Sequence, residues 1–326
     1  MIELIIRKKS FILATAPRRS GKSSILSMIK YFFMLEEKEG VPVTNSSLDN
    51  NDAVVDTSNY KLFTDPPLKI TNYGDIMRQH FGKYPIIFIN FKCKDDIETI
   101  EDAKKEARII IWYVFKRHEY LVTSSKLNDR EKEFCRKFCN HTENDKFIEE
   151  NIEVSLLELS MYLCKHFVVL IDEYDYLCSK SMMKLKKTED IKTVIGFYMD
   201  IINFLLKDNH ENIEFAFLTG ISFICTTGFS SITNIDPHKF LQSEELINFY
   251  GLTEQEFECL LRPYVSKLVL TEAKIYYNGY ECNGIKVYSL WSALKVIYSA
   301  SKQIDNYWVA SGIFEGLSGE RSKSPL

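Results

Sequence analysis

The feature that most constrains this chain is a short basic loop, Ala16–Ser23, which lies between an apolar run and an amphipathic run. The apolar run, Phe11–Thr15, has the length and composition of a strand, and the run after the loop has helical spacing. Backbone N–H groups at the start of a helix point toward an anion, and the helix dipole adds positive charge there. The order of strand, loop and helix therefore predicts a cradle for phosphate.

The loop follows the pattern G-x-x-x-x-G-K-[ST], except that Ala16 stands where the pattern has its first glycine. We expect Gly21 to let the backbone approach the phosphate closely. Lys22 is expected to bind the β- and γ-phosphates, and Ser23 to offer its hydroxyl to Mg²⁺. The incomplete pattern makes a second phosphate-handling feature necessary for a nucleotide site.

That second feature is the run Phe167–Ile171, which is apolar throughout, as a strand buried on both faces should be. Two acids, Asp172 and Glu173, follow it directly. In open parallel sheets, ligands bind at the carboxyl ends of the strands. We expect Asp172 to hold Mg²⁺, directly or through water, because this hard cation prefers oxygen ligands. Glu173 is expected to be the catalytic residue, which orients or deprotonates the attacking water.

Further polar residues are candidates for the same site. Asp175 is expected to assist the metal indirectly or to cap the next helix. Thr219 or Ser222, at the end of another apolar run, is a candidate sensor beside the γ-phosphate. One of Arg18 and Arg19 is expected to contact phosphate or a neighbouring subunit. The expected nucleotide-binding residues are Arg19, Ser20, Gly21, Lys22, Ser23, Ser24 and Thr219, with Ser23 and Asp172 as metal ligands.

The order of apolar runs indicates the fold class. Strand-like runs at 11–15, 85–91, 167–171 and 213–218 are separated by helical patterns, which implies right-handed crossovers and a mainly parallel sheet. Beyond about Asp236 helical patterns dominate. We therefore expect a core over residues 1–240, with a polar insertion at about 40–60, and a small helical module over 241–326. The helices are expected at 22–36, 97–120, 127–140, 144–164, 186–206, 240–248, 253–265 and 288–300, with turns at Asn278-Gly279 and Asn283-Gly284.

Composition limits the classes of partner. The 41 basic and 45 acidic residues give a net charge of −4, which offers no support for nucleic-acid binding. The apolar run Ile109–Phe115 is far shorter than the roughly 20 residues that span a bilayer. Phe11–Leu13 is too short for a secretory signal, which needs about 7–15 apolar residues. We expect a cytoplasmic or nuclear protein without a membrane segment.

The eight cysteines contain no CxxC pair. Cys135, Cys139 and His141 have the spacing of half a zinc site, but no second pair of ligands follows. Scattered reduced thiols are the better interpretation for an intracellular protein.

Several segments occur in the order of a known family, beginning with the loop Pro17–Ser23. The others are Leu26–Met28, Tyr31–Phe33, Tyr84–Phe91, Asp172–Asp175, Leu218–Gly220, Gly251–Glu254, Tyr277–Tyr280 and Tyr307–Trp308. In these motifs the chain resembles the predicted AAA-ATPase-like family, a branch of P-loop proteins related to the AAA+ and STAND classes. The resemblance runs over nearly the whole chain, and the first glycine of the loop is commonly absent in this family.

The resemblance implies an α/β fold of the P-loop NTPase type. This is a three-layer α/β/α arrangement with a mainly parallel sheet, followed by a small mostly helical module. The resemblance also implies ATP and Mg²⁺ as cofactors, and a hydrolase whose cycle moves the helical module. The partners that it implies are a nucleotide and an unidentified protein or a second copy of the chain. The preference for ATP over GTP rests on the resemblance alone.

Two departures from the family leave alternatives open. Phe223 stands where the family usually has an arginine, whose loss costs on the order of 10³-fold in rate if it stabilises the transition state. Many bacterial relatives continue into a nuclease-like domain after the motif that resembles Tyr307–Trp308. Because this sequence ends soon after that motif, at Leu326, we expect it to be the ATPase part alone, with a shortened C-terminal module. The alternatives to an ATPase are a nucleotide-binding switch with little turnover, a nucleic-acid-associated factor and, more weakly, a P-loop kinase.

Overall fold

The structure is a computed structural model of the chain. It describes residues 1–8, 11–38, 41–42, 57–93, 96–140, 146–163, 166–208, 210–223, 235–240, 242–247, 249–277, 280–282, 284–299 and 304–305. The chain divides into two compact units. The sheet unit comprises Met1–Thr15 and Ser23–His238, and the second unit comprises Ala16–Lys22 and Lys239–Leu326. The division into domains 1–240 and 241–326 stays a prediction.

A five-stranded sheet of order β4-β5-β6-β1-β7 forms the centre of the sheet unit. Its strands are β1 (Phe11–Thr15), β4 (Ile86–Asn90), β5 (Phe167–Asp172), β6 (Ile213–Gly220) and β7 (Ile235–Lys239). The pairs β4/β5, β5/β6 and β6/β1 are parallel. Every residue of β1 and β5 is buried, as expected for strands covered on both faces. The predicted α/β class with a mainly parallel sheet is confirmed.

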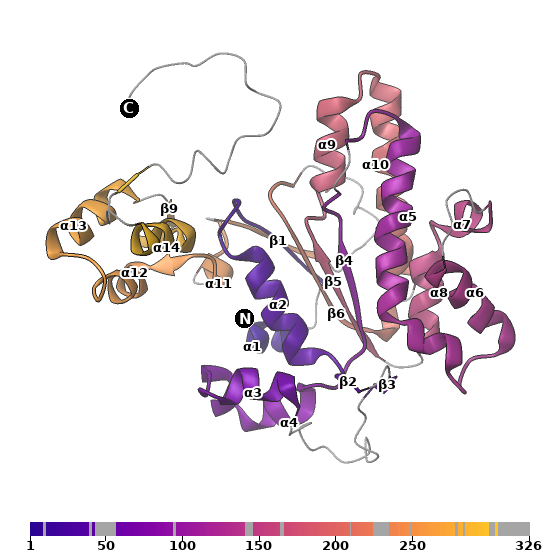
Figure 1. The fold of residues 1–326 in the computed structure, drawn as a ribbon, viewed down its shortest axis with the longest axis horizontal. Helices are drawn as coiled ribbons and strands as arrows, with labels where there is room; N and C mark the ends of the chain where they lie inside the picture. The colour runs from indigo at the N-terminus through magenta and orange to yellow at the C-terminus, as the bar shows by residue number, and fades with distance from the viewer. Residues whose placement is uncertain are drawn as a thin grey trace. The chain divides into compact units, whose positions relative to one another are not determined.

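Helices cover both faces of this sheet, with α2 (Lys22–Phe33) on one side and α5 (Ile100–Arg117) with α10 (Thr188–Lys207) on the other (Figure 1). Alternation of side chains along β6 separates the two faces. Phe215 packs edge-on against Phe33 of α2, with ring centroids 4.7 Å apart. Ala216 and Leu218 belong instead to the core shared with α5 and α10. The sheet unit therefore has three layers.

The sheet unit contains further helices, of which those within 129–162 lie where the periodicity predicted helix, whereas those at 2–8, 58–64 and 176–184 were not predicted. They are α1 (Ile2–Lys8), α3 (Ser58–Thr64), α4 (Gly74–His80), α6 (Asp129–Cys139), α7 (Lys146–Asn151), α8 (Ser155–Tyr162) and α9 (Tyr176–Lys184). Capping boxes at Thr99 and Asn128 begin α5 and α6. The helix expected at 144–164 is two helices, because the chain turns at 152–154. A short ladder of β2 (Glu37–Lys38) and β3 (Val41–Pro42) precedes residues 43–56 of the expected insertion, which lie outside the described residues.

Side chains from the end of α5 cover the outer carbonyl groups of the edge strand β4. His118 Nε2 donates to Ile86 O at 3.2 Å, so its Nδ1 accepts from Tyr120 OH at 3.1 Å. Arg117 donates to Phe88 O at 3.0 Å. Burial lowers the pKa of His118 to about 4, so the imidazole is neutral at pH 7. These bonds occupy acceptors on which another strand would pair.

The second unit combines helices with a three-stranded antiparallel sheet of order β8-β10-β9. Its elements are α11 (Glu244–Ile247), β8 (Leu252–Thr253), α12 (Glu254–Leu261), α13 (Lys267–Tyr276), β9 (Tyr280–Cys282), β10 (Ile285–Tyr288) and α14 (Leu290–Tyr298). Phe257 and Tyr288 stack at its core, with ring centroids 4.4 Å apart. Gly284, with φ +78°, lies in the turn between β9 and β10. Asn278, Gly279 and Asn283 lie outside the described residues.

Candidate functional site

The basic loop occupies the predicted place between the buried strand β1 and the helix α2. Its backbone contains two residues with positive φ, Arg19 at 64° and Gly21 at 94°. No atom lies within 4 Å of a Cβ built on Gly21, so the backbone conformation, not lack of space, favours glycine there. Turns of this kind direct successive N–H groups into one concavity, which is an arrangement that binds anions.

Lys22 lies against its own loop. Its Nζ donates to Ala16 O and to Pro17 O, both at 2.9 Å, and the side chain is buried. Ser20 Oγ also donates to Pro17 O, at 2.8 Å. These acceptors are neutral carbonyl groups, whereas a phosphate carries full negative charge and binds an ammonium group more strongly. The arrangement can therefore release Lys22 to a phosphate.

The structure brings together Ser23 and Asp172, the two predicted metal ligands. Ser23 Oγ donates to Asp172 Oδ2 at 2.8 Å, across 149 positions of sequence. Asp172 is buried at the carboxyl end of β5, and its Oδ1 accepts from the backbone N–H of Glu173 at 3.0 Å. A hydroxyl and a carboxylate side by side are hard oxygen donors of the kind that Mg²⁺ prefers.

Thr219 lies beside this pair because of strand register. Ile171 of β5 pairs with Leu218 of β6, so Asp172 and Thr219 are the next residues along adjacent strands. Thr219 shares its face of β6 with Phe215, which packs on α2. It is fully buried, and its Oγ1 has no hydrogen-bond partner among the described residues. A buried hydroxyl without a partner costs about 1–3 kcal/mol, and a ligand that supplied one would remove that cost.

Asp175 does not cap the helix that follows it, which was one of the two roles expected of it, and its indirect assistance to a metal stays a prediction. It precedes α9, but its side chain makes no capping hydrogen bond. Its buried carboxylate instead accepts from Ser222 N and Ser222 Oγ, both at 2.7 Å, and from Ile221 N at 3.1 Å. The capping prediction is wrong because the turn after β6 offers three donors at once. The same bonds engage the hydroxyl of Ser222, which was the alternative to Thr219 as a sensor.

Tyr174 completes this clamp between the segments that follow β5 and β6. Its backbone N–H donates to Thr219 O at 3.0 Å, and its hydroxyl donates to Ser222 O. A Cβ on Gly220 would lie 2.6 Å from the Tyr174 ring and even closer to Asp175. We define residues 174, 175 and 219–222 as the strand-end clamp. The clamp holds Thr219 next to the acids, and sequence reasoning missed it.

Glu173 follows Asp172 and has φ 53°, which is uncommon for any residue other than glycine. Such backbone outliers cluster at functional sites.

Phe223 packs against the hydrophobic core, so the side chain at the position where the resemblance implied an arginine serves packing. Ser24 is exposed on the first turn of α2.

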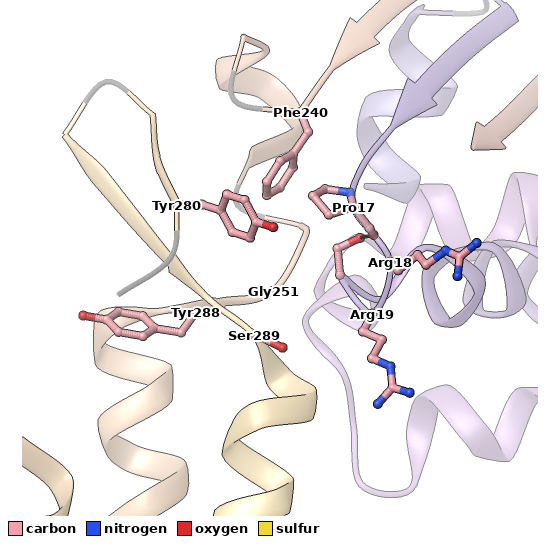
Figure 2. Close-up of a pocket in the computed structure, with 9 residues that line it drawn as sticks. Pro17, Arg18, Arg19, Phe240, Gly251, Tyr280, Tyr288 and Ser289 are labelled. Atoms are coloured by element: carbon pink, nitrogen blue, oxygen red, sulfur yellow. Dashed lines mark hydrogen bonds between the residues drawn. The ribbon is translucent and has the colours of Figure 1, made fainter. Parts of the chain in front are cut away.

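The two loop arginines differ in their surroundings. Arg19 places its guanidinium carbon 3.7 Å from the centroid of the Trp291 ring, within the second unit. Arg18 lines a pocket that residues 17–20 form with Phe240, Gly251, Tyr280, Tyr288 and Ser289. Figure 2 shows Pro17 facing Phe240 and Tyr280, whereas Arg18 and Arg19 point away from these rings. Arg19 is thus engaged by an aromatic ring that the sequence did not connect with the loop.

Cys135 and Cys139, the two closely spaced cysteines, are both buried. Burial raises the pKa of Cys135 to about 12 and that of Cys139 to about 11, so both remain protonated thiols at neutral pH. His141 lies outside the described residues. Within the described ranges, no group of three or more His, Cys, Asp or Glu side chains is arranged to hold a metal ion. Nor does any helix in those ranges have the length and apolar character to cross a membrane.

The fold is an α/β fold with a parallel sheet like that of P-loop proteins. The sequence profile of the family described as "Predicted AAA-ATPase" matches residues 1–230 of this chain, and the chain belongs to that family. Membership implies nucleotide binding. The motifs at Gly251–Glu254, Tyr277–Tyr280 and Tyr307–Trp308 lie beyond the matched residues.

A curated relative from Azotobacter chroococcum mcd 1, named "Uncharacterized protein in vnfD 5'region", is 26% identical over 146 residues. The aligned part is 44% of this chain and 27% of the relative, so the chain spans about a quarter of that protein's length. No solved structure matches the chain.

Proposed function

We propose that this chain binds ATP with Mg²⁺ at the carboxyl edge of the parallel sheet and hydrolyses it. The observation that carries the proposal is the hydrogen bond of 2.8 Å between Ser23 and Asp172. It joins the residue after the loop lysine to the acid at the end of β5. These are the two oxygen ligands that a metal–nucleotide complex needs from a protein of this class.

Each residue has a role that its position supports. Lys22 and the N–H groups of Ser20 and Gly21 bind the β- and γ-phosphates, and Ser24 contributes from the first turn of the helix. Thr219 offers its buried hydroxyl beside Asp172 as the polar contact to the γ-phosphate or the attacking water. Mg²⁺, held by Ser23 and Asp172, would neutralise charge that develops on the phosphate oxygens.

Glu173 is the proposed general base. A carboxylate adjacent to the metal-site acid is suited to hold the attacking water and accept its proton, a role worth about 10²–10⁴-fold in rate. The cycle of binding and hydrolysis is proposed to move residues 241–326. A nucleotide and either an unidentified protein or a second copy of the chain are the proposed partners.

The second candidate is a nucleotide-dependent switch with little turnover. Phe223 favours it, because an aromatic side chain packed on the core supplies no positive charge to a transition state. Both candidates share the same binding site, and they differ in the rate of hydrolysis.

Substitution of Glu173 separates the two candidates. Glu173→Gln should leave MgATP affinity within about threefold and lower phosphate release by about 10²–10⁴-fold if the chain is an ATPase. Glu189→Gln is the matched control, because Glu189 is exposed on α10 with 83% of its side chain accessible. Slow phosphate release that is equal in wild type and Glu173→Gln would remove the catalytic assignment and leave the switch.

A further inference from the structure

An aromatic ring of the second unit holds the phosphate loop by its arginine. The guanidinium carbon of Arg19 lies 3.7 Å from the centroid of Trp291 on α14, well inside the roughly 6 Å of a cation–π contact. Lys295 Nζ lies 4.9 Å from the same centroid. Trp291 lies outside the residues that match the family, so family membership assigns it no role.

The backbone of the loop is held by the same unit. Ser20 O accepts a hydrogen bond of 3.0 Å from Gly251 N, in the turn before β8. Gly251 has φ +84°, and a Cβ there would lie 2.6 Å from Tyr288 O. These contacts and the pocket of Figure 2 connect the loop, residues 16–22, with residues 239–326, and both segments belong to the second unit.

The Arg19 contact is one that a phosphate can displace. A guanidinium prefers the oxygens of a phosphate, which it binds by charge-assisted hydrogen bonds, to the weak negative face of an indole ring. The indole Nε1 of Trp291 is buried and has no hydrogen-bond partner among the described residues. Among those residues, the departure of Arg19 therefore breaks no hydrogen bond of the indole ring.

We propose that Trp291 is a positioning residue that competes with phosphate for Arg19. When a nucleotide phosphate occupies the loop, Arg19 leaves the indole ring, and α14, which carries Trp291, thereby senses the state of the loop. The inference rests on the proposed nucleotide binding, but not on hydrolysis. It assigns Arg19 two alternating partners, where the sequence predicted that one loop arginine contacts phosphate or a neighbouring subunit.

Tryptophan fluorescence tests the displacement directly. The chain has three tryptophans, and the emission of wild type minus that of Trp291→Phe isolates the signal of Trp291. Titration with MgATP should change that signal with the half-saturation measured by calorimetry, and Lys22→Ala should abolish the change. A calorimetric binding signal with unchanged Trp291 emission would overturn the inference alone. Absence of calorimetric binding to the wild type would overturn both it and the proposed function.

Affinity provides a second, independent readout. Trp291→Leu should tighten MgATP binding by about two- to fivefold, which corresponds to an exposed cation–π contact. The gain should vanish in the Arg19→Gln background, because the two residues act as one pair. Tyr298→Leu is the control, since Tyr298 is an exposed aromatic residue on the same helix. Equal effects of Trp291→Leu with and without Arg19 would refute the competition, and the Trp291 emission obtained by subtraction of Trp291→Phe decides the question if Trp291→Leu does not fold.

Discussion

The strand-end clamp makes a quantitative prediction about Asp175. Its carboxylate accepts three hydrogen bonds, from Ser222 N, Ser222 Oγ and Ile221 N, in a buried environment. Hydrogen bonds to a charged group contribute about 1.5–3 kcal/mol each, but the cost of burying the carboxylate offsets much of that sum. Asp175→Ala leaves three donors without an acceptor, so it should lower the free energy of unfolding by about 3–5 kcal/mol.

A graded series separates the hydrogen bonds from the volume of the side chain. Asp175→Asn keeps the shape and one acceptor oxygen but loses the charge, and it should cost about 2 kcal/mol. Ser222→Ala removes one donor of the three and should cost about 1 kcal/mol. Asp208→Asn, at an exposed position after α10, should stay within about 0.5 kcal/mol of wild type.

Urea unfolding followed by far-UV circular dichroism measures this series. At a slope of about 2–3 kcal/mol per M, Asp175→Ala should lower the midpoint by at least ~1 M. A midpoint for Asp175→Ala within ~0.3 M of wild type would refute the reasoning, because it would mean that the turn after β6 finds other acceptors.

Three further predictions concern stability. The pKa of His118 falls from 6.5 unfolded to about 4 folded, so its neutral form stabilises the fold fully above pH 6.5, and that contribution declines as the pH falls toward 4. From pH 7 to pH 5 the free energy of unfolding, measured in urea, should fall by about 2 kcal/mol more for the wild type than for His118→Gln. An equal fall in both proteins would contradict this. Gly220→Ala should lower the thermal midpoint, whereas Gly196→Ala, in open space on α10, should raise it; a neutral Gly220→Ala would rule out the close approach. Gly251→Ala should lower the thermal midpoint more than Gly284→Ala. Both glycines have positive φ, but only a Cβ at position 251 would collide with the backbone, at Tyr288 O. Equal shifts of the thermal midpoint would argue against this close approach.

The features that the sequence predicted well are local patterns. Apolar runs such as Phe167–Ile171 and the basic loop define strands and a strand–loop–helix unit without knowledge of distant contacts. The pairing of Ser23 with Asp172 could be expected because the carboxyl ends of parallel strands meet at one edge.

The features that the sequence did not predict depend on partners distant in the chain or on very short elements. Asp175 looked like a helix cap because an acid before a helix usually is one, and its true donors lie 46 and 47 positions away. The strands β8, β9 and β10 have two to four residues each, too few for an alternating pattern to show. Trp291 was missed because nothing in its local sequence connects an aromatic residue near the end of the chain with Arg19.

The central claim is that the loop ending at Lys22 and Ser23 binds a nucleotide together with Asp172. Isothermal titration calorimetry with ATP, with and without Mg²⁺, tests it most directly on wild type, Lys22→Ala and the control Lys192→Ala, whose lysine is exposed on α10. We predict Mg²⁺-enhanced binding that Lys22→Ala weakens by at least about 10–100-fold, as expected for the loss of one or more charge-assisted hydrogen bonds to phosphate. Affinity for ATP that is the same in wild type and Lys22→Ala would contradict the account.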